Sequence, residues 1–363
     1  MAKTIHVHPR EMVIDDPQMP FTFDGTLCTL RQPNGEVRVW ETDLGNKPYY
    51  FVFQGPAENP LARRIGTFSW DYSGYSDRWP NGLWVQSFYQ VQPDESDHPA
   101  AQTGDLLVGF VHREFFSNAI LPNGALNHGN GSTNSYHIGL ALSLDRGMSW
   151  RYAGDVVSNV MNERKDLANM GGVPFFTVDG CFQFFFNEYP YGTPDPERPG
   201  YVRMTRVHLS AARCNIRETV AALLDGHLPA VWKYSGNGVW DTAPVFETGA
   251  PILSGEHVRC DAHADAAYCS ALGKYLLTAW HTDPAHLCMY TSADGVHFDD
   301  YVTLYLEDNP EIMNPYSTFV AVSEDDSSDD SSTVGREFYI FFPRKGRKDY
   351  GFDQWFRTRI TIE

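Results

Sequence analysis

The sequence lacks a long apolar run and is poor in positive charge. No stretch approaches the roughly 18 to 20 apolar residues of a membrane-spanning helix, and no apolar segment of a secretory signal follows the first residues. The 363 residues carry 28 Lys and Arg against 46 Asp and Glu, a formal net charge of −18. Because nucleic acids and anionic membranes bind basic patches, the charge argues against both as partners. A neutral, hydroxyl-rich ligand is favoured instead.

Cysteine is scarce, and the familiar metal motifs are missing. None of the six cysteines forms a C-x-x-C pair, and most fall in or beside strand-like apolar runs. Such thiols are typical of a reducing compartment, so we expect a cytoplasmic protein, or a periplasmic or secreted one if a signal segment has been removed. Neither HExxH nor EF-hand spacing occurs. The sequence therefore predicts no metal and no cofactor.

Helical periodicity is nearly absent as well. One segment, Ser210 to Gly226, has apolar residues at helical spacing and ends at a glycine. The rest consists of short apolar runs separated by turns, with 30 Gly and 23 Pro. We therefore expect an all-β protein with one short inserted helix. The acidic tract Ser323 to Ser332 contains no apolar residue and is predicted to be a solvated loop.

A turn motif is present twice. Residues 143–150 read SLDRGMSW and residues 292–298 read SADGVHF, each after a short strand-like run. In such a turn the Asp can accept backbone N–H bonds, the Gly supplies a positive φ and the aromatic packs below. The two serines are 149 positions apart. One intervening unit would give a period of about 75 residues and about five units in the chain.

These turns resemble the Asp-boxes of sialidases and other β-propellers. The resemblance implies one domain over residues 1–363, a five-bladed β-propeller. The first blade is hard to complete from its own strands, so we expect a terminus to help close the ring. A true sialidase is not indicated, because the Arg-Ile-Pro segment and the arginine pattern of that family are not visible.

Propeller geometry predicts which residues meet at the axial mouth. First strands start there and second strands end there, because neighbouring strands are antiparallel. Asp24 and Asp265 precede first strands, whereas Glu114 and Glu188 end second strands. The turn carboxylates Asp145 and Asp294 fall on the opposite face and are expected to be structural. Further substrate-binding candidates at the mouth are Trp84, His112, Arg113, Asn169, His263, His281 and Arg344.

Each candidate also has a structural interpretation. Asp24 could cap a turn, and Glu114 could form an ion pair with Arg113. His263 and Asp265 have the His-x-Asp spacing of two side chains on one strand face, which suits either a functional hydrogen-bonded pair or a satisfied core pair. At least half of the aromatic residues near Trp84 are expected to pack in the core.

Carboxylates converging on an aromatic-lined pit suit glycoside hydrolysis. One carboxyl must be protonated to assist the leaving oxygen, while another, ionised, activates water or attacks the anomeric carbon. Crowded carboxylates push their pKa values apart, which supplies both protonation states near neutral pH. Aromatic rings can stack on the apolar faces of sugars.

The chain resembles the five-bladed propeller glycoside hydrolases of the arabinanase, xylosidase and fructosidase group. The resemblance implies that Asp24 is the general base or nucleophile, that a later Glu is the acid and that another Asp tunes it. The general acid could be any of three residues, Glu188, Glu114 or Asp265. A carbohydrate partner, neutral and pentose- or furanose-containing, is expected. The alternatives are a glycoside phosphorylase with His112, Arg113 and Arg344 cradling phosphate, a polysaccharide lyase, or a non-catalytic carbohydrate-binding propeller.

Overall fold

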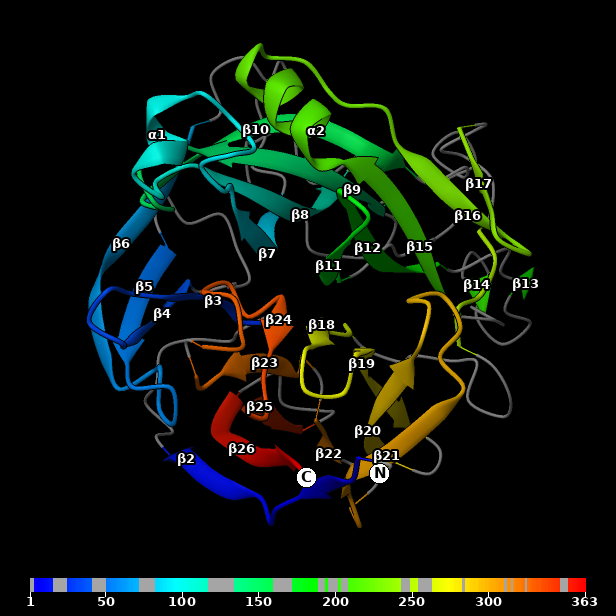
Figure 1. Cartoon of the computed structure of the whole chain (residues 1–363). Helices are drawn as coiled ribbons and strands as arrows, with labels where there is room; N and C mark the ends of the chain where they lie inside the picture. The colour runs from blue at the N-terminus through cyan, green and yellow to red at the C-terminus, as the bar shows by residue number, and fades with distance from the viewer. Residues whose placement is uncertain are drawn as a thin grey trace, which may run out of the picture.

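The computed structural model describes residues 3–363 except 16–24, 41–49, 72–81, 117–133, 159–171, 189–192, 195–201, 204–207, 243–248, 254–262, 283–284, 310–311, 315, 324 and 347–351. Its strands form a ring of sheets around a central axis (Figure 1). No helix in these ranges is long and apolar enough to cross a membrane. Of the six cysteines, five are free, and Cys260 lies outside the described residues.

The strand pairings divide the ring into five units of mainly antiparallel sheet, arranged around the axis (Figure 1). A short parallel pairing of β6 with β10 joins the first two units into one eight-stranded sheet. Blade one contains β3 (Cys28–Arg31), β4 (Val37–Trp40), β5 (Tyr50–Gly55) and β6 (Arg63–Asp71); blade two contains β7 (Gly82–Gln90), β8 (Leu107–Phe116), β9 (Asn134–Ser143) and β10 (Ser149–Ser158).

The other three units follow the same order. Blade three contains β11 (Phe175–Val178), β12 (Cys181–Glu188), β15 (His208–Asn215), β16 (Trp232–Gly236) and β17 (Val239–Asp241). Blade four contains β18 (Ala266–Cys269), β19 (Lys274–Thr282), β20 (Ala285–Ser292) and β21 (Asp300–Leu306), with β24 (Thr333–Val334) beside β18. Blade five contains β22 (Ile312–Met313), β23 (Thr318–Ala321), β25 (Glu337–Gly346) and β26 (Phe352–Ile362). A separate hairpin joins β13 (Thr193–Pro194) to β14 (Val202–Arg203).

The N-terminus completes the last blade. Both β1 (Ile5–Val7) and β2 (Glu11–Asp15) pair with β26, so the first and last segments of the chain lie in one sheet (Figure 1). The two N-terminal strands cover the outer edge of β26 and so fasten the first segment of the chain to the last. The expectation that a terminus helps to close the ring is confirmed, but its premise was wrong: blade one is complete with β3 to β6, and the N-terminus pairs with blade five.

The predicted helix starts later than expected. Residues 210–215 belong to β15 and pair with β12, and the helix α2 covers Ile216–Leu224. Asn215 caps it, because its side-chain oxygen accepts a hydrogen bond from the backbone N–H of Glu218 at 3.0 Å. The segment before Asn215 has no strand period of its own, and its pairing with β12 is what makes it a strand. A second, one-turn helix, α1, covers Pro99–Gln102.

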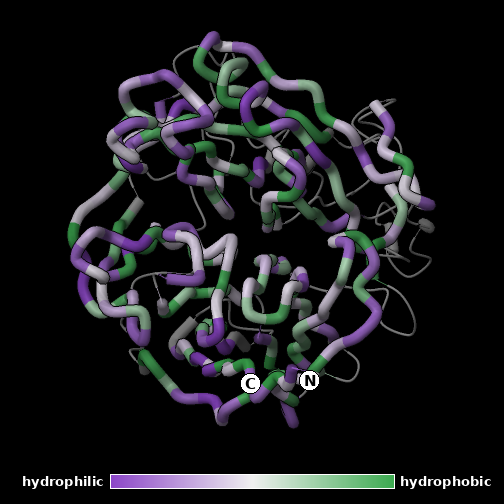
Figure 2. Tube along the Cα trace, in the orientation of Figure 1, coloured by the Kyte–Doolittle hydropathy of each residue, from purple (hydrophilic) through white to green (hydrophobic). Residues whose placement is uncertain are grey.

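Aromatic residues fill the spaces between blades. Phe110 of blade two stacks on Phe175 of blade three, with ring centroids 4.8 Å apart, and Phe182 closes the same cluster. Along the chain, hydrophobic stretches alternate with hydrophilic ones (Figure 2). Burial of this apolar surface between neighbouring blades stabilises the ring, because a single blade cannot cover its own faces.

The acidic tract packs against the axis, so the prediction of a solvated loop is wrong for its second half. The backbone N–H of Arg31 donates to the carbonyl of Asp329, that of Gln90 to the carboxylate of Asp330, and that of Tyr268 to the carbonyl of Ser332. Ser331 and Ser332 are buried. The tract thus contacts the inner strands β3, β7 and β18. It lies at the end of the axis where β3 and β7 finish. The open mouth is therefore expected at the opposite end, where the inner strands begin.

The two repeated turns have the same hydrogen-bond pattern. Asp145 accepts bonds from the Ser143 hydroxyl and the Ser149 N–H, both at 2.8 Å, and Asp294 accepts from the Ser292 hydroxyl and the His297 N–H at 3.0 and 2.9 Å. Each turn also binds the preceding blade, since Trp40 donates to the carbonyl of Gly147 and Gln183 to that of Gly295. The turns therefore fasten neighbouring blades together.

We expect Asp145→Ala to lower the free energy of unfolding by about 1–2 kcal/mol, because three turn donors, the Ser143 and Ser149 hydroxyls and the Ser149 N–H, lose their acceptor. Urea denaturation measures the change. The matched control is Leu144→Ser, an exposed neighbour whose substitution should cost less than about 0.5 kcal/mol. Equal losses in both variants would contradict a specific role for the carboxylate.

Candidate functional site

A row of four rings marks the end of the axis where the inner strands begin. Trp84 and His112 belong to blade two, His263 precedes β18 of blade four and Tyr316 precedes β23 of blade five. Their ring centroids are 5.5 Å apart for Trp84 and His112, 5.4 Å for His112 and His263, and 5.0 Å for His263 and Tyr316. Side chains from three blades thus meet at one place. Three of them, Trp84, His112 and His263, are candidates that the sequence predicted for the mouth.

The backbone at Tyr316 is strained. Its φ is 62°, in the left-handed region that non-glycine residues rarely adopt, and such a conformation costs on the order of 1–3 kcal/mol. Trp84 is only 3% exposed, and its indole N–H has no hydrogen-bond partner among the described residues. A strained backbone of this kind is typical of a site shaped for a ligand.

Gln86 links the ring row to the chain that follows Asp24. The hydroxyl of Thr26 donates to the Gln86 carbonyl at 2.5 Å, and Nδ1 of His263 lies 3.4 Å from the Gln86 side-chain oxygen. A Cβ at Gly25 would lie 2.3 Å from Nε2 of Gln86, so any larger residue there would displace the Gln86 side chain. Asp24 itself and Asn169 lie outside the described residues. The residue directly after Asp24 is nevertheless fixed beside the ring row.

Asp265 lies two residues beyond His263 in an enclosed position. Its carboxylate accepts hydrogen bonds from the backbone N–H groups of Ala266 at 2.9 Å and Phe319 at 2.7 Å, rather than from His263. The bond to Phe319 also joins blade four to blade five. Burial raises the pKa of Asp265 to about 7, although the two N–H groups oppose the shift. Near neutral pH this carboxyl can therefore carry a proton.

The raised pKa of Asp265 predicts a pH-dependent stability. Between about pH 4 and pH 7 the folded protein holds a proton on Asp265 that the unfolded chain has released, so this group makes stability fall as the pH rises. In Asp265→Asn this contribution is absent. We expect the stability of the wild type relative to the variant to fall by about 1–3 kcal/mol over that range. Urea denaturation at several pH values, with Asp300→Asn as an exposed control, measures it; a constant difference would contradict the shift.

Glu188 lies in a buried ionic cluster of blade three. It is 6% exposed, and its oxygens accept hydrogen bonds from Lys233, from the Ser210 hydroxyl at 2.6 Å and from the Gly249 N–H at 2.7 Å, with His208 Nε2 at 3.6 Å. Burial disfavours the charge, but His208, Lys233 and Ser210 together hold the pKa of Glu188 below its usual range. Glu188 is therefore ionised at neutral pH and is a poor proton donor.

Arg113 and Glu114 lie within β8, which continues to Phe116, so the predicted end of this second strand was placed too early. Nη1 of Arg113 donates to Asp155 at 2.6 Å, and the same carboxylate lies 3.6 Å from Nδ1 of His137 and accepts from Tyr152. Arg113 thus faces Asp155 on an outer strand. The backbone of Glu114 is paired with Gly82 and Tyr136, but its side chain lies outside the described part of the chain.

Another buried carboxylate, that of Glu307, lies between blades four and five. Glu307 follows β21, which also ends at the mouth, and Nε of Arg344 lies 3.7 Å from its Oε2. Fully buried Asn314 donates to the same oxygen at 3.3 Å. The sequence reading missed Glu307 because it considered only first and second strands, although fourth strands finish at the same end.

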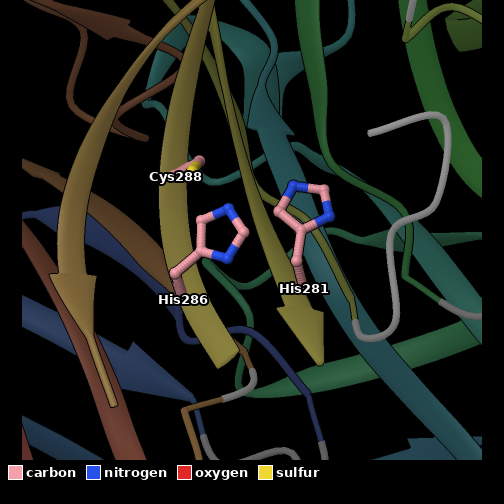
Figure 3. Close-up of side chains that lie close together, drawn as sticks. All are labelled: His281, His286 and Cys288. Carbon is pink, nitrogen blue, oxygen red and sulfur yellow. The ribbon is translucent and has the colours of Figure 1, made fainter. Parts of the chain in front are cut away.

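His281 ends β19 and stacks on another imidazole. Its ring centroid lies 4.8 Å from that of His286, and its Nε2 is 2.8 Å from the Tyr290 hydroxyl. His281, His286 and Cys288 are the described His, Cys, Asp and Glu side chains whose ligand atoms come close enough to hold a metal (Figure 3).

Comparison with known proteins supports the fold. No protein-family model matches this sequence, and no curated protein matches it. The structure is similar to that of a GH43_1 enzyme from Xanthomonas citri complexed with xylotriose, with a TM-score of 0.50 and 9% identity over 97% of this chain and 89% of that chain. A protein of unknown function from Dyadobacter fermentans has a TM-score of 0.49 and 10% identity, covering 99% of both chains. For a family 117 glycoside hydrolase from Zobellia galactanivorans the values are 0.48 and 10%, over 99% of this chain and 90% of that one.

At these identities the likeness concerns the fold. The predicted resemblance to five-bladed propeller glycoside hydrolases is thereby confirmed for the architecture, and the chain shares the propeller fold of the Xanthomonas citri enzyme.

Proposed function

We propose that the protein is a glycoside hydrolase that cleaves a neutral, pentose- or furanose-containing glycan or oligosaccharide. The observation that carries the proposal is the ring row Trp84, His112, His263 and Tyr316, which lies beside the residues that follow Asp24. Aromatic rings stack on sugar faces, and imidazole and indole N–H groups can bind hydroxyls. The fold is that of the Xanthomonas citri hydrolase, whose structure contains xylotriose.

Two carboxyl groups receive different roles in this proposal. Asp24 is assigned as the base or nucleophile, which requires the ionised form. Asp265 is assigned as the proton donor, because its pKa of about 7 leaves it partly protonated where the enzyme would work. Glu114, two positions after His112 in β8, is the alternative donor. Ionised Glu188 is assigned a positioning role through the cluster that includes Lys233.

The phosphorylase alternative receives little support from the two arginines that would cradle phosphate. Arg113 faces Asp155 and Arg344 faces Glu307, so both positive charges already have a carboxylate beside them. An inorganic phosphate would have to compete with these anions. The other two alternatives, a polysaccharide lyase and a non-catalytic carbohydrate-binding propeller, are distinguished by the assay described next.

A release assay distinguishes these functions. Purified protein is incubated with a panel of aryl glycosides and neutral oligosaccharides, with and without inorganic phosphate, and the reducing sugar and product configuration are recorded. We expect release that does not need phosphate and gives no unsaturated product. A requirement for phosphate would identify a phosphorylase, an unsaturated sugar a lyase, and sugar binding in calorimetry without turnover a binding protein.

A further inference from the structure

A buried histidine–cysteine cluster lies in blade four. His281 ends β19 and pairs directly with His286 on β20, and Cys288 follows His286 by two residues on the same face of that strand. The three side chains project toward a common space from two adjacent strands (Figure 3). Their ligand atoms all lie within 4.8 Å of one another, and all three residues are buried.

The surroundings of the cluster are apolar. Cys288 and Tyr290 belong to the hydrophobic cluster between blades three and four, together with Phe185 and Leu209. Burying two imidazoles in such a place is costly unless their ring nitrogens have partners. The Tyr290 hydroxyl already partners Nε2 of His281 and Thr303 bonds the Cys288 thiol, so the side chains are held around the space that a cation would occupy.

We propose that His281, His286 and Cys288 bind a borderline-soft divalent metal ion, with Zn²⁺ as the representative. Imidazole nitrogen and thiolate sulfur are the donors that zinc prefers, and this set of two nitrogens and one sulfur suits soft transition metals far better than Ca²⁺ or Mg²⁺. On binding, the thiol proton of Cys288 leaves to solvent and the two imidazoles bind as neutral rings. The Tyr290 hydroxyl, 2.8 Å from His281 Nε2, lies where it can orient that ring.

The distances require only a small contraction. Zinc bonds of about 2.0–2.1 Å to nitrogen and about 2.3 Å to sulfur place tetrahedral ligands roughly 3.3–3.8 Å apart. Ligand atoms within 4.8 Å therefore need to approach by about 1 Å, which rotation of the side chains supplies. The bound ion would tie β19 to β20 near the turn that joins them. Its role is accordingly structural and does not depend on the proposed hydrolase activity.

Cobalt binding tests the site. The full chain is treated with a chelator, dialysed and titrated with Co²⁺, whose bond to a thiolate gives a charge-transfer absorption band. We expect one equivalent of Co²⁺ to produce this band and Zn²⁺ to abolish it by displacement. Cys288→Ser should lose the band, whereas Cys269→Ser, which alters another buried thiol of the same blade, should keep it.

A second variant distinguishes the loss of a metal ligand from a general loss of folding. In His286→Gln the thiol is intact, and we expect Zn²⁺ affinity to fall by at least about 10²-fold, together with loss of the zinc-induced rise in Tm. Circular dichroism confirms that each variant is folded. No thiolate band in the folded wild type, or a band that persists in Cys288→Ser, would overturn the proposal.

Discussion

Asp24→Asn is expected to lower the rate of glycoside release by at least about 10²-fold, with little change in Tm. The amide is nearly the same size as the carboxylate but can neither accept a proton from water nor attack the anomeric carbon. Gly25 and Thr26 fix the following backbone against Gln86, so the substitution should not move the chain. The measurement is kcat/KM on the best substrate of the glycoside panel.

Asp145→Asn is the matched control for this variant. Asp145 is also an aspartate in a turn, but it lies in the SLDRGMSW turn, next to Asp105 before β8, on the face away from the mouth. We expect it to retain most of the activity at temperatures where it remains folded. Full activity in Asp24→Asn would remove Asp24 from the mechanism.

Lys233→Met is expected to lower the free energy of unfolding by about 3–5 kcal/mol. Lys233 and Glu188 are both buried and in contact, and removal of the ammonium leaves an ionised carboxylate without its counter-charge. Met preserves most of the length of the side chain, so the loss of packing should contribute little. Urea denaturation at neutral pH measures the difference.

A double variant separates charge from packing. In Lys233→Met with Glu188→Gln the buried negative charge is gone, so part of the lost stability should return. Acid provides a further check: the lowered pKa of Glu188 means that its contribution is present at neutral pH and is lost as the pH falls through the acid range. If the double variant were as unstable as the two single losses added together, the ion pair would not be the cause.

Much of the ring could be predicted from local patterns. The strands of blade two are indicated by alternating apolar residues. The turns at Asp145 and Asp294 are indicated by their Asp and Gly residues, and both signals depend on only a few neighbouring residues. The start of α2 was misplaced because residues 210–215 suit a strand only once β12 lies beside them. The tract around Asp330 looked like a solvated loop because its partners, Arg31, Gln90 and Tyr268, lie far away in the sequence.

The candidate site was only partly predictable. The rule that first strands begin and second strands end at one mouth brought His112 and His263 together, as the structure shows. It could not reveal that Glu188 would face Lys233, since that contact depends on the register of β12, β15 and β16. One signal was available: Lys233 stands in the apolar strand sequence VWKY, where a charge usually requires a buried partner.

Hydrolysis in oxygen-18-labelled water tests the central claim most directly. The wild type is incubated with the oligosaccharide that it cleaves best, and the new reducing end is examined by mass spectrometry. A glycoside hydrolase must place one oxygen from water at the anomeric carbon, and Asp24→Asn should abolish this product formation. Product without the label, or no product from any neutral glycan despite sugar binding, would contradict the account.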